Sequence, residues 1–455
     1  YMTLGCLTGR TTLAQLAATW GVSWGGNLCG ALFLCALFAL GGGGDLLQPV
    51  GSLLHKVAAY KMNSDAAALL ARAGHTVSVY DQFDAPGPVG SGLILQETGL
   101  CILEELGLRA QAEQFGAPLN KLHGITVESG RTVLDVRYDA IRPSLRGVSI
   151  QRPALFGLVF QAAKDAGAKI VPSTRILSAQ PVGGYLTTGE GETLGPFDLV
   201  VDALGVRSPL SSRPRTQLAY GALWATLPWD DELGFERDAL AQRYRKAHQM
   251  AGVMPSGRLA EDAPDTLTYF WSIRADQHAA WKQAPLEEWK REAVDLWPET
   301  ALLLDGLKNH EQLTFARYDH RTHRPVVNQR LVHIGDSWHA ASPQLGQGAN
   351  MALLDAYALA RALGQPDALD RQLRHYKAMR AGHVRLFQMM SWLFTPVYQS
   401  DSAALAWLRD WLAAPLSRVP PAPQILAAMV SGGLGSPLKR LGLSPGDQPP
   451  SDFNR

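Results

Sequence analysis

The sequence predicts an α/β fold, in which a helix-covered parallel sheet carries an inserted α+β domain and a helical C-terminal region. Two stretches carry this prediction. Residues 64–83 read as an apolar helix, a stop at Gly74 and a strand, and residues 330–363 read as a strand, a glycine-rich turn and a long helix. Strands that alternate with helices in this way are typical of α/β proteins. Composition agrees, because 46% of the residues are hydrophobic and 18% are charged.

Charge and cysteine content exclude several function classes. The formal net charge is +1, so we expect no nucleic-acid partner. The four cysteines (Cys6, Cys29, Cys35 and Cys101) match no zinc-site or disulfide spacing. We therefore expect no metal site, and a reducing, cytoplasmic compartment is the default.

The N-terminal part differs in composition from the rest of the chain. No charged residue occurs between Arg10 and Asp45, and Trp20 to Leu40 has about the 20 residues that a membrane span needs. Gly26 and Gly30 have the small-xxx-small spacing of packed membrane helices. The pattern predicts a transmembrane-like helix with membrane association through residues 20–40. A buried helix of a soluble protein stays open as the alternative.

This part resembles one span of the formate/nitrite transporter family and the flank of that span. The resemblance rests on Gly26 to Ala31 (GNLCGA) and His55 to Asn63 (HKVAAYKMN). Those transporters build a pore from several helices in an oligomer, so a single span predicts no transport.

Residues 64–83 match the second half of a dinucleotide-binding βαβ unit. Gly74 suits the end of the helix, and Asp81 suits the acid that binds a ribose hydroxyl after the second strand. The third glycine of the GxGxxG turn belongs about 20 residues before that acid. No glycine occurs between Gly51 and Gly74, and the run from Gly41 to Gly44 lies too far upstream. We interpret this as a gene fusion that replaced the first strand and its glycine turn.

A second cofactor-type motif lies at Arg330 to Leu363. A strand ends at Gly335-Asp336, and Pro343 and a glycine-rich loop precede a long apolar helix. A carboxylate just after a strand can hold a sugar hydroxyl, and glycines let backbone N–H groups approach a ring. The helix start then favours negative charge. The loop consists of Gly346, Gln347, Gly348, Ala349 and Asn350.

From Ser64 to about Ala428 the chain resembles the para-hydroxybenzoate-hydroxylase-like, FAD-dependent monooxygenases. The Gly335 to Asn350 string carries the resemblance, and Gly90 to Leu108 and Gln151-Arg152-Pro153 agree with it in order and spacing. The resemblance implies that Arg152 and the residues of the two motifs contact FAD. Asp198 to Ser208 departs from the family pattern, because Leu204 stands where an aspartate is usual.

The resemblance also implies the chemistry. NAD(P)H would reduce the FAD, and one oxygen atom of O₂ would enter a small, aromatic substrate. His339 is interpreted as support for the flavin loop. Tyr269, Trp271 and Arg317 are candidate pocket residues, although a structural role is favoured for each, and no catalytic base is assigned. Oligomeric state is left open.

The predicted organisation has five parts. The first is the transporter-like segment 1–63. The last two are a helical region 369–443 and a tail 444–455. The Trp, Met and Phe stripe of the helical region is interpreted as helix packing. Between them lie a Rossmann-like FAD-binding domain (64–120, 140–209 and 318–368) and a substrate domain (121–139 and 210–317). Three hypotheses remain open: a monooxygenase with weakened FAD binding, a non-catalytic membrane-tethered protein, and a transporter fragment.

Overall fold

The computed structural model describes residues 64–85 and 90–444, all within one compact unit, Val57–Arg455. The predicted membrane span 20–40 and the tail from Pro445 onward lie outside the described residues. Among the described helices, none is both long and apolar enough to cross a bilayer.

Short parallel strands form the core of the cofactor half. Strand β1 (Ser78–Tyr80) pairs with β7 (Lys169–Val171), and the two form a separate two-stranded sheet. Strand β11 (Val200–Asp202) pairs in parallel with β18 (Leu331–His333), which also pairs with β17 (Val327–Asn328). The strands predicted at 76–80 and 331–334 are therefore confirmed.

Three helices cover these two short sheets from one side. They are α3 (Ser64–Arg72), α6 (Arg152–Asp165) and α11 (Gly348–Leu363), and α3 packs against both of the others. Their alanine- and leucine-rich faces form one apolar core. The three helices therefore form one continuous layer. The strand layer is not continuous, because no described strand pairs with the second edge of β1 or of β11.

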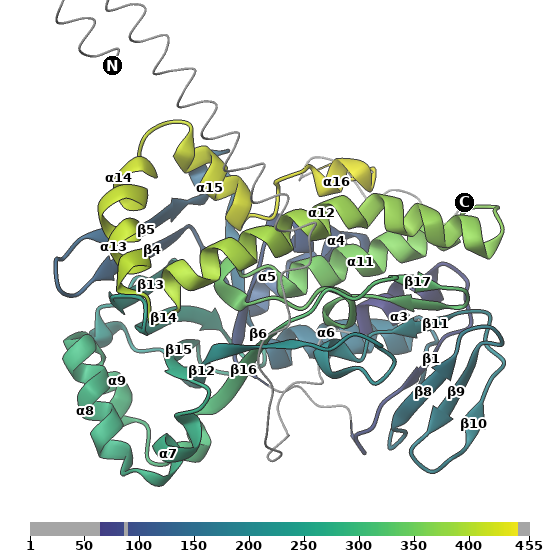
Figure 1. The fold of residues 1–455 in the computed structure, drawn as a ribbon, viewed down its shortest axis with the longest axis horizontal. Coiled ribbons are helices and arrows are strands. Elements are labelled where there is room, and N and C mark those ends of the chain that lie inside the picture. Colours follow the sequence, from purple (N-terminus) through teal and green to yellow (C-terminus); the bar gives the residue numbers. More distant parts are fainter. Residues whose placement is uncertain (1–63, 86–89, 445–455) are drawn as a thin grey trace, which may run out of the picture. The chain divides into compact units, whose positions relative to one another are not determined.

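A seven-stranded sheet forms the other half, in the order β16-β12-β15-β14-β13-β4-β5. Its strands are β4 (Lys121–Thr126), β5 (Thr132–Arg137), β12 (Thr216–Pro228), β13 (Ala239–Arg245), β14 (Gln249–Gly257), β15 (Thr266–Arg274) and β16 (Thr314–His320). The predicted strands near 125–138 and 267–274 are confirmed. Helices α7 (His278–Gln283), α8 (Leu286–Leu296) and α9 (Ala301–Asp305) lie on one face (Figure 1).

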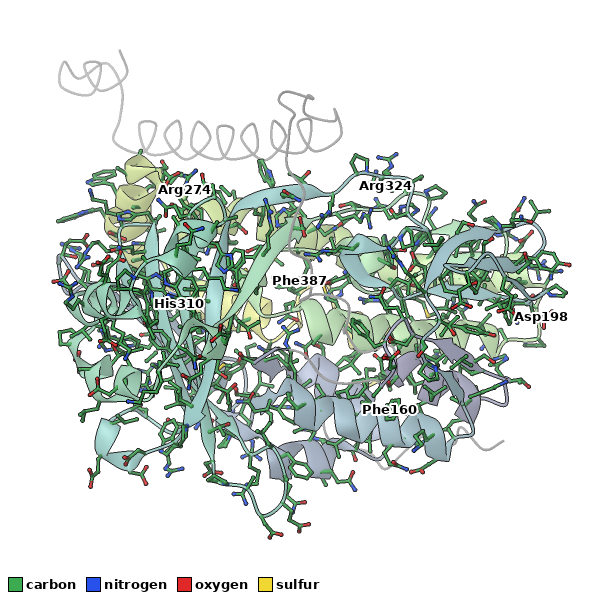
Figure 2. The ribbon with its side chains drawn as sticks, turned by 90° about the horizontal axis from the view of Figure 1, so that it is seen from below. Phe160, Asp198, Arg274, His310, Arg324 and Phe387 are labelled. Carbon is green, nitrogen blue, oxygen red and sulfur yellow. The ribbon has the colours of Figure 1, made fainter. Side chains whose placement is uncertain are left out.

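Smaller elements connect the two halves. A three-stranded sheet contains β2 (Gly92–Leu95), β6 (Gly147–Gln151) and β3 (Ala117–Leu119), and β6 leads directly into α6. Helices α4 (Glu97–Glu105) and α5 (Arg109–Phe115) follow β2 in the chain. A separate antiparallel sheet contains β8 (Ile176–Gln180), β9 (Tyr185–Thr188) and β10 (Thr193–Leu194). Figure 2 shows Arg274 and His310 on the substrate-sheet side, and Asp198 and Arg324 on the cofactor side.

The C-terminal region is helical, as predicted. The long helix α12 (Leu369–Tyr398) runs beside α11 and is followed by α13 (Ala403–Leu408), a π-helical turn (Arg409–Ala413), α14 (Ala414–Leu416), α15 (Ala422–Val430) and α16 (Pro437–Arg440). The segment from α13 to α15 lies on the sheet end formed by β4, β5 and β13, opposite α8 and α9 (Figure 1).

Candidate cofactor and active site

The turn after β18 has a backbone that only glycine adopts readily. Gly335 has φ +56° and lies between the strand and α10 (Asp336–His339). Its N–H donates a 2.9 Å hydrogen bond to Oδ2 of Asp355 on α11. The carboxylate of Asp336 therefore stands at a fixed place just past the end of the strand, as the motif predicts.

Asp355 holds this turn through a buried charge network. Its Oδ2 also accepts from Nε2 of His339 at 2.6 Å, and its Oδ1 accepts from Nε of Arg380 at 2.6 Å. Burial alone would raise the pKa of Asp355, but His339 and Arg380 outweigh burial and hold that pKa below its ordinary value. His339 thus supports the loop, in agreement with its interpretation.

Asn350 ties the start of α11 to the end of β2. Its Oδ1 accepts from the N–H of Gln96 at 2.8 Å, and its Nδ2 donates to the carbonyl oxygen of Ile94 at 3.0 Å. Since Asn350 is fully buried and these bonds use its amide, it positions the loop rather than facing a ligand. Gly348 is exposed and Ala349 half-buried, so the open side of the loop is its glycine-rich backbone.

The start of α11 suits a group with polar edges. The first N–H groups of a helix have no partner within the helix, and they favour negative charge. Close by, the amide of Gln96 is fully buried beside Gly346 and has a polar contact with the phenol of Tyr138.

Arg152 begins α6 and extends across Gly90. A side chain at Gly90 would stand 3.0 Å from Cδ of Arg152, and the φ of Gly90 is +111°, so this position requires glycine. Burial lowers the pKa of Arg152, while the charges of Asp336 and Tyr318 oppose that change. The structure therefore brings Arg152 and Asp336, two residues predicted from separate motifs, into one electrostatic cluster.

An aromatic wall adjoins this cluster. Trp224 and Phe270 lie opposite each other on β12 and β15, with ring centroids 4.8 Å apart. Tyr318 on β16 interacts with both Trp224 and Arg152, and burial raises its pKa above the ordinary value. The wall is therefore connected to Arg152 and Asp336 through Tyr318.

The pocket residues expected from the sequence lie elsewhere. Tyr269 and Trp271 point to the opposite face of the sheet, where both rings pack against Trp289 of α8. Arg317 is exposed at the edge strand β16. The prediction identified the strands, and its preference for structural roles agrees with the packing of Tyr269 and Trp271 against α8.

Asp81 and Asp202, two further acids of the cofactor half, have different surroundings. Asp81 follows β1, and its Oδ1 accepts from the N–H of Phe83 at 2.9 Å. Asp202, at the end of β11, is fully buried, and it accepts from Leu204 N at 3.0 Å and Ser208 Oγ at 2.7 Å. A third bond joins Asp202 to Nδ1 of His333 at 2.7 Å, so Asp202 has a structural role.

Three contributors to the site were missed from the sequence: Asp355, Arg380 and Gln96. Asp355 is the only acid in the apolar helix α11, which is a recognisable signal for a buried ionic contact. No local pattern marks Arg380 or Gln96, since their roles depend on contacts between distant segments.

Comparisons with known proteins agree with this geometry. A family profile described as "FAD binding domain" matches residues 64–389. The 2-heptyl-3-hydroxy-4(1H)-quinolone synthase of Mycobacteroides abscessus is 26% identical, over 69% of this chain and 82% of the relative. The 6-hydroxynicotinate 3-monooxygenase of Pseudomonas fluorescens is 25% identical, over 72% and 89% respectively.

Solved structures show the same fold. Klebsiella pneumoniae HpxO, complexed with FAD and uric acid, has a TM-score of 0.66 at 18% identity and matches 82% of this chain and 95% of its own. The profile match covers residues 64–389. The motifs and the cluster of Arg152 and Asp336 lie within this range. The chain therefore belongs to the FAD binding domain family of FAD-dependent monooxygenases.

Proposed function

We propose that the protein hydroxylates a small aromatic or heteroaromatic substrate, with FAD as its cofactor. The observation that carries this proposal is the cluster of Arg152, Asp336 and Tyr318, in which Tyr318 also contacts Trp224 of the aromatic wall. Bound FAD supplies the electrons that activate O₂ for insertion of one oxygen atom into a ring. The relatives support an aromatic substrate, because their names include a hydroxynicotinate monooxygenase and a kynurenine monooxygenase.

The residues that would hold the cofactor come from three places in the chain. In this proposal Asp336 and Asp81 accept hydrogen bonds from sugar or ribitol hydroxyls, and Arg152 holds an anionic part of the cofactor. Asn350 keeps the loop in register with β2 through Gln96. The backbone that would approach the ring consists of Gly335, Pro343, Gly346, Gln347, Gly348 and Ala349.

The chain's own residues then have defined tasks. The N–H groups at the start of α11 favour negative charge near the cofactor, which a flavin carries after reduction. Because the pKa of Tyr318 is raised, its phenol stays protonated at neutral pH and can donate a hydrogen bond. Trp224 and Phe270 offer an apolar surface that excludes water from a planar substrate.

An arginine-rich surface suits the phosphates of NAD(P)H, the proposed reductant. Burial lowers the pKa of Arg207, and the charges of Arg215 and Arg317 lower it further, whereas Asp319 opposes them. Asp319 pairs with Arg215 at 3.0 Å, so the surface keeps an excess of positive charge. Such clusters favour multiply charged anions.

FAD binding is proposed to be weak. We infer that residues 1–63 are a transporter-like segment that replaced the first strand and the glycine turn. This inference is supported by the edges of β1 and β11 that no strand of residues 64–85 and 90–444 pairs with.

Absorbance and turnover of the purified full-length protein test the proposal. We expect the flavin bands to be lost on gel filtration, and NADPH oxidation with aromatic probes such as 6-hydroxynicotinate or kynurenine to require added FAD. The R152Q variant should need about tenfold more FAD, since a hydrogen bond to a charged group is worth about 1.5–3 kcal/mol. The exposed Arg146 provides the control variant R146Q.

Two results would contradict this proposal. NADPH oxidation and oxygenated product that stay absent at every FAD concentration would reject the hydroxylase. They would leave a non-catalytic, membrane-tethered protein, or a transporter fragment that vesicle uptake of formate would reveal. Stoichiometric FAD that survives gel filtration would instead reject weak binding and leave the hydroxylase standing.

A further inference from the structure

The helices from α13 to α15 expose an unusual number of large apolar side chains. We call these seven residues the C-terminal apolar surface: Trp407, Leu408, Trp411, Leu412, Leu416, Val419 and Ile425. Trp407 is 61% exposed, Trp411 51% and Leu416 57%. Contiguous exposed apolar patches of this kind mark interaction sites in soluble proteins.

Packing within the chain does not account for these side chains. The residues of the same helices that face the core include the small Ala406, Ala414 and Ala427, together with Met429 and Val430 at the end of α15. Trp407 and Trp411 are four residues apart, as are Leu408 and Leu412, so they form adjoining stripes on the outer side. The Trp, Met and Phe stripe that was predicted to pack is therefore divided: Met379, Phe387 and Met390 of α12 are buried, whereas Trp407 and Trp411 are exposed.

The segment is nevertheless held firmly on the protein. Arg409 is almost fully buried, and its Nη2 donates to the carbonyl oxygen of Lys246 at 2.9 Å. Its guanidinium lies 5.0 Å from the centroid of the Tyr244 ring, and its Nε bonds Asp410 at 2.7 Å. The apolar side chains are thus displayed by an anchored scaffold.

Basic side chains lie beside the surface. Asp410 is the only acidic residue from Ser402 to Ser444, and it is paired with Arg409. Arg418 is exposed beside the β4–β5 hairpin, where its Nη2 donates to the carbonyl oxygen of Thr132 at 3.2 Å. Arg131 of that hairpin places its guanidinium 3.7 Å from the centroid of the Trp411 ring.

We propose that the C-terminal apolar surface binds the surface of an anionic phospholipid bilayer. Tryptophans prefer the headgroup level of a bilayer, and leucines beside them can enter the acyl boundary while arginines meet anionic headgroups. A second copy of the chain fits less well, because a two-fold contact would bring Arg131 and Arg418 of both copies together. This inference goes beyond the proposed hydroxylation and does not depend on it.

Vesicle co-sedimentation of the full-length protein provides the test. Vesicles of phosphatidylglycerol and phosphatidylcholine in equal parts would be compared with phosphatidylcholine alone. The L412S/L416S variant should bind at least about tenfold more weakly, since two leucine side chains would no longer be buried among the acyl chains. The matched control L259S/L302S replaces two other exposed leucines and should bind like wild type. R418Q should lose mainly the preference for phosphatidylglycerol.

Several outcomes would overturn the proposal. One is wild-type protein that stays in the supernatant with both kinds of vesicle. Another is unchanged binding of L412S/L416S, which would move the contact elsewhere, including to residues 20–40. A third is a dimer in light scattering that L412S/L416S converts to monomers, which would assign the surface to a second copy. Circular dichroism and thermal unfolding of each variant show whether it is folded.

Discussion

Single buried side chains connect the cofactor turn to the C-terminal region. Arg380 bonds Asp355 on one side, and on the other its Nη1 lies 3.0 Å from Nδ1 of His383. Nε2 of His383 donates to the carbonyl oxygen of Gly432 at 3.2 Å. A change at any of these positions is therefore expected to affect the turn at Gly335, although Arg380 and His383 lie on α12.

Replacement of Asp355 by asparagine should destabilise the protein strongly. The D355N variant leaves the guanidinium of Arg380 buried without its carboxylate, and loss of one partner of a buried pair costs about 3–5 kcal/mol. Urea unfolding measures this difference. D367N is the control, because Asp367 forms an exposed pair with Arg371 that contributes at most about 1 kcal/mol. Equal effects of the two variants would show that the buried network is not important for stability.

His383 should make the protein sensitive to mild acid. Burial, followed by the charge of Arg380, lowers its pKa from 6.5 to about 3. Because the folded-state pKa is the lower one, only the unfolded chain binds this proton between those values, and stability falls as the pH falls. From pH 6.5 to 4.5 the loss should be about 2–3 kcal/mol.

Urea unfolding at a series of pH values measures this slope. The H383Q variant removes the titrating group and should flatten the slope in that window, whereas H375Q, at an exposed position of the same helix, should leave it unchanged. A slope that persists in H383Q would assign the acid sensitivity to other groups, among which His323 also has a pKa lowered to about 4.

At the scale of single residues, the sequence predicted the residues of the motifs and missed the buried residues that hold the motifs in place. Asp336 and Arg152 were found because their motifs are local strings, and the structure places them in one cluster. Asp355 and Arg380 were missed because their pairing spans two helices. The sequence did not show which face of its strand Tyr269 occupies, because the choice of face depends on which layer covers the sheet.

Among the elements, α4 and α11 interlock through a glycine. Any side chain at Gly99 would overlap Oδ1 of Asn350, the atom that accepts from Gln96. We expect G99A to destabilise the protein by about 1–3 kcal/mol, the cost of overpacking. It should also weaken FAD binding, because the loop before α11 would lose its register with β2.

The matched substitution on α6 should have the opposite sign. Gly157 lies within that helix with nothing near the position of an added Cβ, so G157A should stabilise by about 0.5–1 kcal/mol through helix propensity. Thermal unfolding of the two variants measures both effects. If G99A were as harmless as G157A, Asn350 would be free to move, and its proposed positioning role would be wrong.

The elements themselves were predicted unevenly. Helices α4, α6 and α11 were expected because each follows a recognisable motif and has an apolar face. The seven-stranded order of the second sheet was not expected. It pairs β4 with β13, which begins more than 100 residues later in the chain, and such a non-local pairing leaves no local signal. The membrane-type helix expected at 20–40 lies outside the described residues and stays a prediction.

The whole molecule combines a well-paired half with a poorly paired half. Strands β14 and β15 have partners on both edges, whereas β1 and β11 each have one unpaired edge in the described part of the chain. The halves contact each other through polar bonds, including Gly92 N to Thr268 Oγ1 at 3.1 Å and Gln151 Nε2 to Thr266 Oγ1 at 3.0 Å. Local opening is therefore expected in the cofactor half first.

Hydrogen exchange followed by mass spectrometry tests this expectation. Without FAD, peptides that cover β1 and β11 should exchange about tenfold or more faster than peptides from β14 and β15, since local opening of poorly paired segments costs less free energy. FAD at about 100 times its Kd adds about 2.7 kcal/mol to the folded state. That protection should be concentrated in β18, α10 and the start of α11, where the cofactor is proposed to bind. Equal protection of β1 and β15 without FAD would mean that the unpaired edges are covered in solution, and it would remove the main argument for weak FAD binding.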